Sequence, residues 1–268
     1  MKNARQKQIV EMLINTGAVN TRELMDHFGV SIETIRRDYN ELEKEGLLKK
    51  TYGGAVLVSN FLRISEVAAW QERRRTASRE KILIARQAAG HIPNGCVLAL
   101  EVGTTMFELA RQLEVRNNLT VLTNDIYVAQ ELWRNPTNHV YLAGGLLGSA
   151  NYTVGYLARE FIEKFALIDV FLLSSEGLTL EDGLTTPNAE INDLKKIFLQ
   201  KASRTIALVD HSKFGKKATL RTCGFEALDL LITDSKAPAG LMKKIREKGL
   251  EVEVVKAGDT EEGESGVP

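Results

Sequence analysis

The feature that most constrains the fold is a change of pattern near residue 81. From there to Val255, short apolar segments alternate with stretches of helical periodicity. Apolar strands separated by helices are typical of an α/β domain with a mostly parallel sheet. The expected strands are Cys96–Val102, Leu119–Thr123, Val140–Ala143, Val170–Ser174, Thr205–Val209, Leu228–Thr233 and Glu251–Val255. The expected helices include Thr105–Leu113, Tyr127–Arg134, Tyr156–Phe165 and Ile191–Ala202.

The N-terminal residues follow a different pattern, that of three short helices and a hairpin. Residues 3–15 carry an apolar stripe, Asn20 and Glu23 have the spacing of a capping box, and Ser31 can cap a third helix. Two short strands are expected around a glycine turn: Leu47–Thr51 and Ala55–Val58. This order predicts a winged helix-turn-helix, whose third helix enters the major groove of DNA.

The chain is therefore predicted to have two domains, which its 268 residues allow. A winged helix-turn-helix domain is expected at residues 1–58, and an α/β domain that binds an effector at residues 81–256. Residues 59–80 lack clear periodicity and contain five arginines, which favours a linker. The polar, acidic residues 257–268 are typical of a disordered tail.

Composition excludes several classes of protein. The net charge is zero, and the first 58 residues hold nine Lys or Arg against eight Asp or Glu, so any affinity for DNA must come from locally placed charges. Two cysteines and four scattered histidines form no disulfide framework or metal motif, so neither a metal ion nor a cofactor is expected. No signal-peptide core and no apolar run near ~18 residues is present, which favours a cytoplasmic protein without a membrane partner.

A helical projection separates the side chains of the third helix. At about 100° per residue, Ile32, Ile35, Tyr39 and Leu42 share a narrow sector that must face the core. The opposite sector holds the candidate base-reading side chains, namely Thr34 and Arg37, with Glu33 as a weaker candidate. Arginine can pair with guanine, and the threonine methyl can contact thymine.

The remaining polar positions suit phosphate contacts or capping. These are Ser31, Arg36, Lys49 and Lys50. An ordinary surface helix is the alternative, because Glu33 and Arg37 have the i,i+4 spacing of a surface pair worth only ~0.2–0.5 kcal/mol. The capped helix before this segment and the basic wing after it favour the DNA-reading interpretation.

Several separated motifs in this region occur in a familiar order. They are Val30-Ser31, Thr34-Ile35-Arg36-Arg37-Asp38, Leu42, Gly46 and Tyr52-Gly53-Gly54-Ala55. With them, residues 3–57 resemble the N-terminal domain of the DeoR family of bacterial sugar-metabolism regulators. The resemblance implies that Ser31 to Arg37 belongs to the DNA-reading segment and that the protein represses transcription.

In the second domain, polar turns follow several expected strands. Glu101-Val102-Gly103-Thr104-Thr105 stands where a strand should end and a helix begin, and helix-start amides favour anions. Other turns contain Asn124, Gly144-Gly145, Glu176 and Lys213. The carboxyl ends of parallel strands are where α/β sheets bind ligands, so a shared pocket is expected. Taken singly, each turn also suits a helix cap, a plain turn or a solvated loop.

The DeoR-like resemblance continues through most of residues 73–234. It rests on Glu80-Lys81, Gly103-Thr104-Thr105, Leu119-Thr120-Val121, Thr123-Asn124, Gly144-Gly145, Gly155, Gly183-Leu184-Thr185-Thr186, Asp210, Ser212-Lys213-Phe214-Gly215 and Ile232-Thr233-Asp234. It implies a sensor domain similar in fold to ribose-5-phosphate isomerase that senses phosphorylated sugars or related metabolites. The positions that the resemblance assigns to the effector site are Gly103, Thr104, Thr105, Asn124, Gly144, Gly145 and Lys213, and the acidic candidates beside them are Glu101 and Glu176.

Three departures from the family pattern bear on the effector. Glu101 stands where the family usually has aspartate, and no basic residue lies between Leu146 and Leu157, where the family often has one. The usual acidic residue of the following helix aligns with Ile191, which leaves Glu190 one position early. A sugar phosphate held by amides and Lys213, or a less charged sugar derivative, fits these departures.

The leading hypothesis is a regulator that binds operator DNA as a symmetric dimer or tetramer, under the control of a small sugar-derived effector. The alternative is a sugar-phosphate isomerase with an appended DNA-binding module. Its candidate base would be Glu176 or Glu190, assisted by Asp210 and Lys213. A third hypothesis, an architectural DNA-binding protein, predicts no response to any effector.

Overall fold

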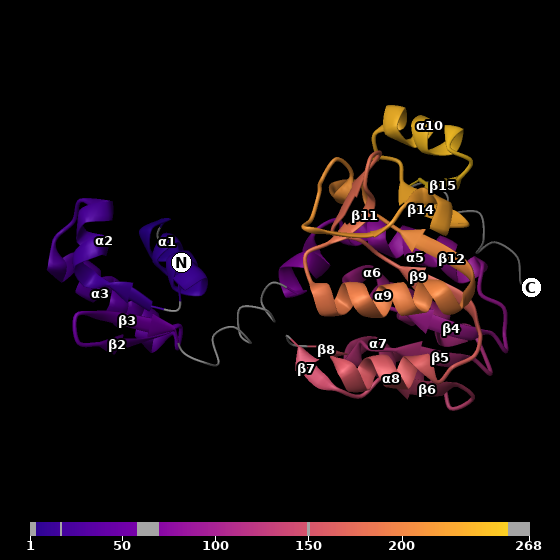
Figure 1. The fold of residues 1–268 in the computed structure, drawn as a ribbon, viewed down its shortest axis with the longest axis horizontal. Coiled ribbons are helices and arrows are strands. Elements are labelled where there is room, and N and C mark those ends of the chain that lie inside the picture. Colours follow the sequence, from indigo (N-terminus) through magenta and orange to yellow (C-terminus); the bar gives the residue numbers. More distant parts are fainter. Residues whose placement is uncertain (1–3, 17, 58–69, 149–150, 257–268) are drawn as a thin grey trace, which may run out of the picture. The chain divides into compact units, whose positions relative to one another are not determined.

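The computed structural model describes residues 4–16, 18–57, 70–148 and 151–256, which form two compact units, Met1–Ala69 and Trp70–Pro268 (Figure 1). The expected tail 257–268 and half of the expected linker, residues 59–69, lie outside the described residues. The linker does not extend as far as expected, because residues 70–75 are helical and α5 covers Ser78–Gly90. Residues 70–80 therefore belong to the second unit.

The first unit is a winged helix-turn-helix. Its helices are α1 (Ala4–Thr16), α2 (Thr21–Phe28) and α3 (Ile32–Lys44). Its strands are β1 (Ala18–Asn20), β2 (Leu48–Thr51) and β3 (Gly54–Leu57), which pair antiparallel in the order β1-β3-β2. The expected two-stranded wing is thus a three-stranded sheet. Gly54 allows the third strand to approach, since a Cβ there would lie 2.1 Å from the carbonyl oxygen of Val19.

Local sequence sets the boundaries of these helices. The Asn20 side chain accepts a hydrogen bond from the amide of Arg22 and begins α2. Gly29 ends α2 with a φ of +63°, a left-handed conformation that costs glycine little. Buried side chains of all three helices and the wing then form one small core: Ile9, Leu13, Leu24, Ile35, Tyr39, Leu42 and Leu48.

Asp38 is a buried charge that holds α1 against α3, and the helical projection gave it no role. Its Oδ2 lies 2.6 Å from Nε of Arg5, and its Oδ1 accepts from Nε2 of Gln6 at 3.1 Å. The hydrogen bond to Asp38 raises the pKa of Arg5. Asp38 is 2% exposed, so this pairing replaces the water that the carboxylate loses on folding.

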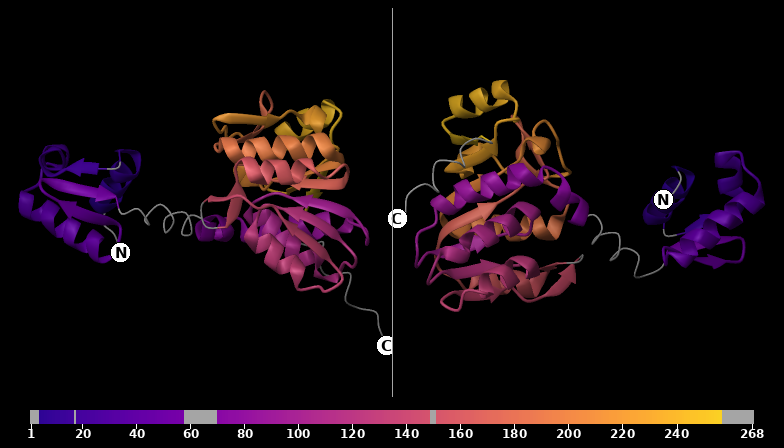
Figure 2. Two further views of the ribbon diagram at one scale, coloured as in Figure 1. Left: turned by 60° about the horizontal axis from the view of Figure 1, so that its bottom comes forward. Right: turned by 180° about the vertical axis from the view of Figure 1, so that it is seen from behind.

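The second unit is a three-layer α/β domain, which confirms the fold class expected from the alternating pattern (Figures 1 and 2). Its seven-stranded sheet has the order β15-β14-β12-β9-β4-β5-β6, and every neighbouring pair is parallel. The strands are β4 (Val97–Leu100), β5 (Thr120–Thr123), β6 (His139–Leu142), β9 (Ile168–Leu173), β12 (Ala202–Leu208), β14 (Leu230–Asp234) and β15 (Glu251–Val255).

Helices cover both faces of this sheet. One face packs against α5, α6 (Thr104–Gln112) and α7 (Ile126–Trp133), through buried side chains such as Leu98 and Leu172. The other packs against α8 (Tyr156–Glu163), α9 (Ala189–Lys201) and α10 (Ala239–Glu247), through side chains such as Phe171. Since both faces are buried at the centre of the sheet, the central strands β4, β5 and β9 are mostly apolar, which is what made them recognisable.

Two smaller sheets and three short helices complete the unit, and none of them was expected from the sequence. The hairpin strands are β7 (Leu146–Gly148) and β8 (Tyr152–Val154). The second sheet contains β10 (Gly177–Thr179), β11 (Gly183–Thr186) and β13 (Leu220–Cys223). The 3-10 helices are η1 (Leu113–Val115), η2 (His211–Lys213) and η3 (Phe225–Ala227). No helix among the described residues is long and apolar enough to span a membrane.

We predict that Asp38→Ala destabilises the first unit by about 1–3 kcal/mol, because the buried hydrogen bonds that join Arg5 and Gln6 of α1 to the carboxylate on α3 are lost. Hydrogen exchange of α1 and α3 in the full chain, read by mass spectrometry, measures the local loss of protection. Glu33→Ala is the control, because Glu33 is an exposed acid of the same helix. Equal protection in both variants would contradict a structural role for Asp38.

Candidate functional site

The start of α3 is fixed by its own side chains. Ser31 caps the helix, and its Oγ accepts from the amide of Thr34 at 3.4 Å and lies 3.2 Å from the hydroxyl of the same residue. Ile35, Tyr39 and Leu42 are buried, as the projection predicted, and Ile32 is half-buried. Thr34 is itself half-buried, so its methyl group rather than its engaged hydroxyl is the part that remains for a base contact.

Arg36 and Arg37 are both exposed on α3. Within the part of the chain that the structure describes, neither forms an ion pair, and the surface pair that the spacing of Glu33 and Arg37 allowed is not formed. Both guanidinium groups are therefore available to an outside acceptor. Exposure is the same for both, so it does not distinguish Arg37 as the base-reading residue from Arg36 as the phosphate contact.

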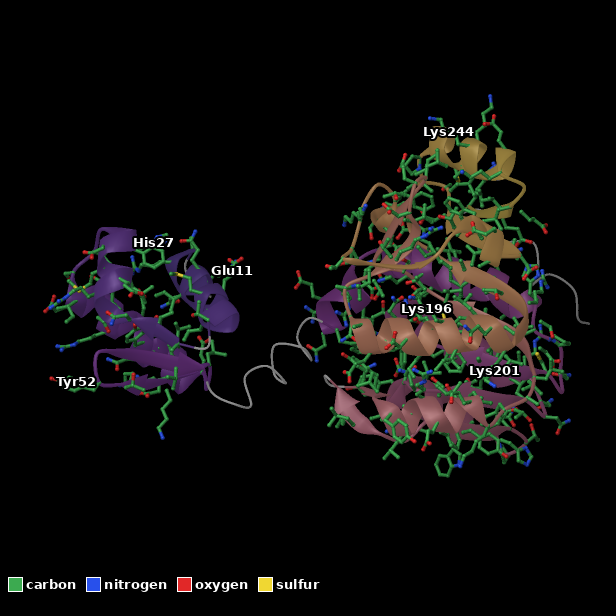
Figure 3. All side chains as sticks on the ribbon, in the orientation of Figure 1. Glu11, His27, Tyr52, Lys196, Lys201 and Lys244 are labelled. Carbon is green, nitrogen blue, oxygen red and sulfur yellow. The ribbon has the colours of Figure 1, made fainter. Side chains whose placement is uncertain are left out.

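The wing presents its two lysines differently. Lys49 is exposed. Lys50 Nζ lies 2.8 Å from Oε2 of Glu43 and also donates to Oδ1 of Asn40 at 2.7 Å. Its contact with Glu43 lowers the pKa of that carboxyl group. Lys50 thus fastens the wing to α3, and Glu43 offsets its charge. Tyr52 is fully exposed in the turn between β2 and β3 (Figure 3).

In the second unit, the expected effector residues follow the carboxyl ends of adjacent parallel strands. The chain order reverses between β4 and β9, which are neighbours in the sheet although β5 and β6 come between them in sequence. Such a switch point is where open α/β sheets bind ligands. Glu101 and Gly103 follow β4 there, and Ser174 and Glu176 follow β9.

A buried ion pair lies at this switch point. Glu101 Oε2 is 2.9 Å from Nζ of Lys195, a residue of α9, and both side chains are 2% exposed. The other carboxylate oxygen accepts from the amide of Ser174 and, at 2.9 Å, from its hydroxyl. Lys195 also donates to the carbonyl oxygen of Ser174 at 2.9 Å and lies 4.0 Å from Glu176.

Burial and pairing act in opposite directions on these two groups. Burial raises the pKa of Glu101 to about 7, and the nearby ammonium group of Lys195 limits that rise. Burial lowers the pKa of Lys195, but the carboxylates of Glu101 and Glu176 outweigh this and leave its pKa raised. Lys195 is therefore a cation at neutral pH, and Glu101 is held close to its titration point.

The first turn of α6 is buried and begins without a side-chain cap. The helix begins with Thr104 and Thr105 after Gly103. The amide of Gly103 donates to Oδ2 of Asp125 at 3.2 Å, so the free amides are those of the following residues. A Cβ on Gly103 would lie 2.9 Å from the hydroxyl oxygen of Ser174, so glycine allows the two strand-end loops to approach each other.

The turn after β5 is built around a buried carboxylate. Asp125, rather than Asn124, caps α7, accepting from the amides of Tyr127 and Val128. Burial raises the pKa of Asp125 to about 6. The hydrogen bond that its carboxylate accepts from Asn151 Nδ2 at 2.8 Å acts in the opposite direction and limits the rise. Asn124 is also buried, and its Nδ2 donates to the carbonyl oxygen of Thr153 at 3.0 Å, so it ties the turn to β8.

The structure does not gather every expected residue around one small ligand. Gly144 and Gly145 follow β6, whereas Lys213 follows β12, four strands away, a separation of roughly 19 Å along the sheet edge. Both glycines are exposed, and Lys213 is half-buried. The residues that follow the two strands of the switch point are Gly103, Thr104 and Thr105 after β4, and Ser174 and Glu176 after β9.

Sequence reasoning missed Lys195, the most buried cation at the site. The signal was present, since Lys195 is four residues after Ile191 and three before Phe198, both of which are buried. A lysine on the apolar face of a helix is costly unless an acid pairs with it. Glu190, the isomerase candidate, is exposed on the same helix, and Asp210 is buried as the cap of η2.

A winged helix-turn-helix joined to an α/β domain with a polar switch point defines a DNA-binding transcriptional regulator. The model of the DeoR-like helix-turn-helix domain matches residues 5–61, and that of the DeoR C-terminal sensor domain matches residues 76–235. The chain belongs to the DeoR family, and the resemblance seen in its motifs is confirmed.

The chain is similar, over most of its length, to three named transcriptional regulators. The chain is 35% identical over 251 residues to the HTH-type transcriptional regulator GolR of Listeria innocua, covering 93% of this chain and 97% of the relative. It is 33% identical over 251 residues to the glycerol-3-phosphate regulon repressor of Escherichia coli, covering 93% and 98%. The transcriptional repressor AccR of Agrobacterium fabrum is 34% identical, with 86% of this chain and 89% of the relative covered.

Solved structures give more distant similarities. Ribose 5 phosphate isomerase A from Neisseria gonorrhoeae aligns with a TM-score of 0.37 and 12% identity, covering 50% of this chain and 52% of that protein. A probable sor operon regulator from Shigella flexneri aligns with a TM-score of 0.42 and 9% identity, covering 63% and 88%. Similarities this distant carry no functional conclusion.

We predict that Lys195→Met destabilises the second unit by about 3–5 kcal/mol at pH values above the folded pKa of Glu101, because the Glu101 carboxylate is then buried without a counter-charge. Glu101 is protonated in both the folded and unfolded states below its unfolded pKa of about 4.3, so the loss should be small there and grow as pH rises through the higher folded pKa. Denaturant unfolding at several pH values, followed by tryptophan fluorescence, measures this.

The matched control is Lys196→Met, since Lys196 is the exposed neighbour on α9 (Figure 3). The double variant Lys195→Met with Glu101→Gln should recover part of the stability and lose most of the pH dependence. A pH-independent loss in Lys195→Met would contradict the pairing.

Proposed function

We propose that this chain represses an operon of sugar or polyol metabolism, and that a small phosphorylated polyol or sugar bound at the β4–β9 switch point changes its affinity for operator DNA. The observation that carries the effector proposal is the uncapped first turn of α6 at the switch point. Its free amides and the hydroxyls of Thr104 and Thr105 suit phosphate and sugar oxygens. The name of the Escherichia coli relative, a glycerol-3-phosphate regulon repressor, supports the same class of effector.

The charges near the switch point suit a small anion rather than a highly charged one. Lys195 is offset by Glu101, and Glu176 adds a further carboxylate 4.0 Å from the same ammonium group. The segment after Gly145 supplies no cation. A single phosphate held by the α6 amides, with Lys213 at the neighbouring strand end, balances these groups better than a diphosphate would.

The DNA side of the proposal assigns base reading to Arg37 and Thr34, with Glu33 as a weaker contact. Ser31, Arg36 and Lys49 are assigned to the phosphate backbone. Lys50 is assigned there too, although its first contact is Glu43. This division follows the usual one, in which base contacts specify the sequence and phosphate contacts position the protein.

The test uses the purified full chain and DNA from upstream of its own gene, with binding followed by fluorescence anisotropy. Glycerol 3-phosphate, glycerol and a panel of sugar phosphates are titrated separately. Sequence-specific binding that one phosphorylated compound changes, and its unphosphorylated counterpart does not, is expected. Specific binding that no compound alters would remove the effector proposal, and no specific binding would remove the operator proposal. Turnover of a pentose phosphate would instead favour the isomerase alternative.

For the DNA surface, we predict that Arg37→Ala weakens operator binding by about 1–3 kcal/mol and relaxes the preference at one base pair, because a bidentate base contact is lost. Arg36→Ala should weaken binding to all sequences alike and reduce the salt slope by about one. Lys44→Ala, an exposed cation in the last turn of α3, is the control. Unchanged affinity and preference in Arg37→Ala would overturn its assignment.

We further propose a physical route from the effector to the DNA-binding unit. Residues 70–77, which follow the inter-unit segment, pack on the two helices that begin at the effector site. The ring of Trp70 lies 5.7 Å from that of Phe107 on α6 and 4.7 Å from that of Tyr127 on α7. Arg74 stacks 4.6 Å from the ring of Phe107 and lies 3.4 Å from Glu108.

A buried lysine holds the same segment in place. Lys81 Nζ donates to the carbonyl oxygens of Arg73 and, at 2.8 Å, of Thr76. Burial lowers the pKa of Lys81 to about 8, and the nearby carboxylate of Asp210 opposes this. Movement of α6 on binding an anion would therefore reach residues 70–77 directly.

We predict that Arg74→Ala leaves effector affinity without DNA within about two-fold, but shrinks the effector's change in operator affinity, for which 1–3 kcal/mol is typical. Isothermal titration and operator binding measure the two quantities. Arg75→Ala is the matched control, because Arg75 is its exposed neighbour in the same helix. A full effector response in Arg74→Ala would contradict the proposed route.

A further inference from the structure

The seven-stranded sheet ends on an unprotected strand. β6 is the last strand of the sheet, and no strand among the described residues pairs with its outer edge. None of its four residues is an acid, lysine or arginine. The opposite edge strand, β15, carries Glu251 and Glu253, and Glu253 is bonded to Gln87 and His91. Proteins usually protect edge strands with charge, so β6 is the unprotected edge of the seven-stranded sheet.

An apolar groove runs beside this edge. It has a volume of about 300 Å³ and lies between α7 and β6. Its lining residues are Ile126, Ala129, Gln130, Trp133, Val140 and Leu142. Trp133 stands at its rim with 75% of its surface exposed, which amounts to about 190 Å² for a side chain of this size. No charged residue lines the groove.

The apolar surface continues past the groove. Tyr141 is 42% exposed on the other face of β6, and Leu142 is 40% exposed. Leu146 and Leu147 follow on β7 with 68% and 46% exposed. Figure 1 places β6, β7, β8 and α8 together at one end of the second unit. We call Trp133, Tyr141, Leu142, Leu146 and Leu147 the edge face.

The edge face is an apolar patch of substantial size. Isolated exposed apolar residues are common, but contiguous patches above a few hundred Å² are rare on monomers. The exposed parts of these five residues amount to about 560 Å², roughly two-thirds of the ~800 Å² that each partner buries in a standard interface.

We propose that the edge face is where two copies of this chain associate about a two-fold axis, with β6 antiparallel to β6 and each Trp133 entering the groove of the other copy. A surface with both a projecting ring and a groove is complementary to itself, as an isologous contact requires. The charged residues of α7 beside Trp133 are compatible with this association, because Glu131 and Arg134 already pair with each other at 2.8 Å within one copy. The proposal rests on the proposed function in one respect, since a two-fold operator needs two DNA-binding units.

The first test is sedimentation velocity of the full chain, with Trp133→Glu as the variant. The wild type is expected to be a dimer or a multiple of one, and Trp133→Glu should halve its mass. Val115→Glu is the control, because Val115 is equally exposed, at 76%, but lies outside the edge face. A monomeric wild type, or an unchanged mass in a folded Trp133→Glu, overturns the proposal.

A second test does not depend on how well Trp133→Glu folds. The chain contains two cysteines, Cys96 and Cys223, both buried, and burial raises their pKa to about 11 and about 12. Leu142→Cys therefore introduces a single reactive thiol. A short bis-maleimide should join Leu142→Cys into dimers and leave Val115→Cys monomeric. Equal cross-linking of both, or of neither, counts against the edge face.

Operator binding separates the failure of this proposal from that of the proposed function. If mass and cross-linking fail as described while the wild type binds its operator, the regulator proposal stands and the interface lies elsewhere. If Trp133→Glu halves the mass while no operator is bound, the interface stands and the regulator proposal falls.

Discussion

The ion pair between Lys195 and Glu101 is the contact on which the sensor unit depends most. It joins a helix from one layer to the end of a central strand, and the same carboxylate holds the loop after the neighbouring strand through Ser174. Removing two charges from water is costly, and this geometry compensates through the 2.9 Å ion pair and the hydrogen bonds that Ser174 makes to both groups.

A buried acid has a similar part in the first unit. Asp38 joins α1 to α3 and lies next to Arg37, which is exposed. These two adjacent residues thus differ in environment: Asp38 is buried and fixes α3 against α1, whereas Arg37 is exposed on the helix surface. This explains how a domain with almost no net charge can present cations to DNA. Two of its acids are engaged within the domain, because Asp38 pairs with Arg5 and Glu43 holds the wing through Lys50.

The departures from the family pattern have structural counterparts. The segment that lacks a basic residue forms the β7–β8 hairpin, which contributes apolar surface to the edge of the sheet. Glu190 is exposed, whereas Lys195, one turn after Ile191, faces the strand ends. The buried cation at the switch point therefore comes from α9, which lies between β11 and β12 in the chain.

The sequence alone determined the two domains, the strand–helix order and the three helices with their caps. These depend on local periodicity and on capping residues such as Asn20 and Ser31, which act within a few positions of the chain. The third strand of the wing, the hairpin and the edge of the linker were not predictable in this way, because each depends on pairing or burial against distant residues. The same holds for Lys195 with Glu101 and for Asp125 with Asn151. Glu101 and Lys195 are 94 positions apart in the chain, and Asp125 and Asn151 are 26 apart. Only the tertiary structure brings the members of each pair together, and this pairing offsets the cost of burying their polar groups.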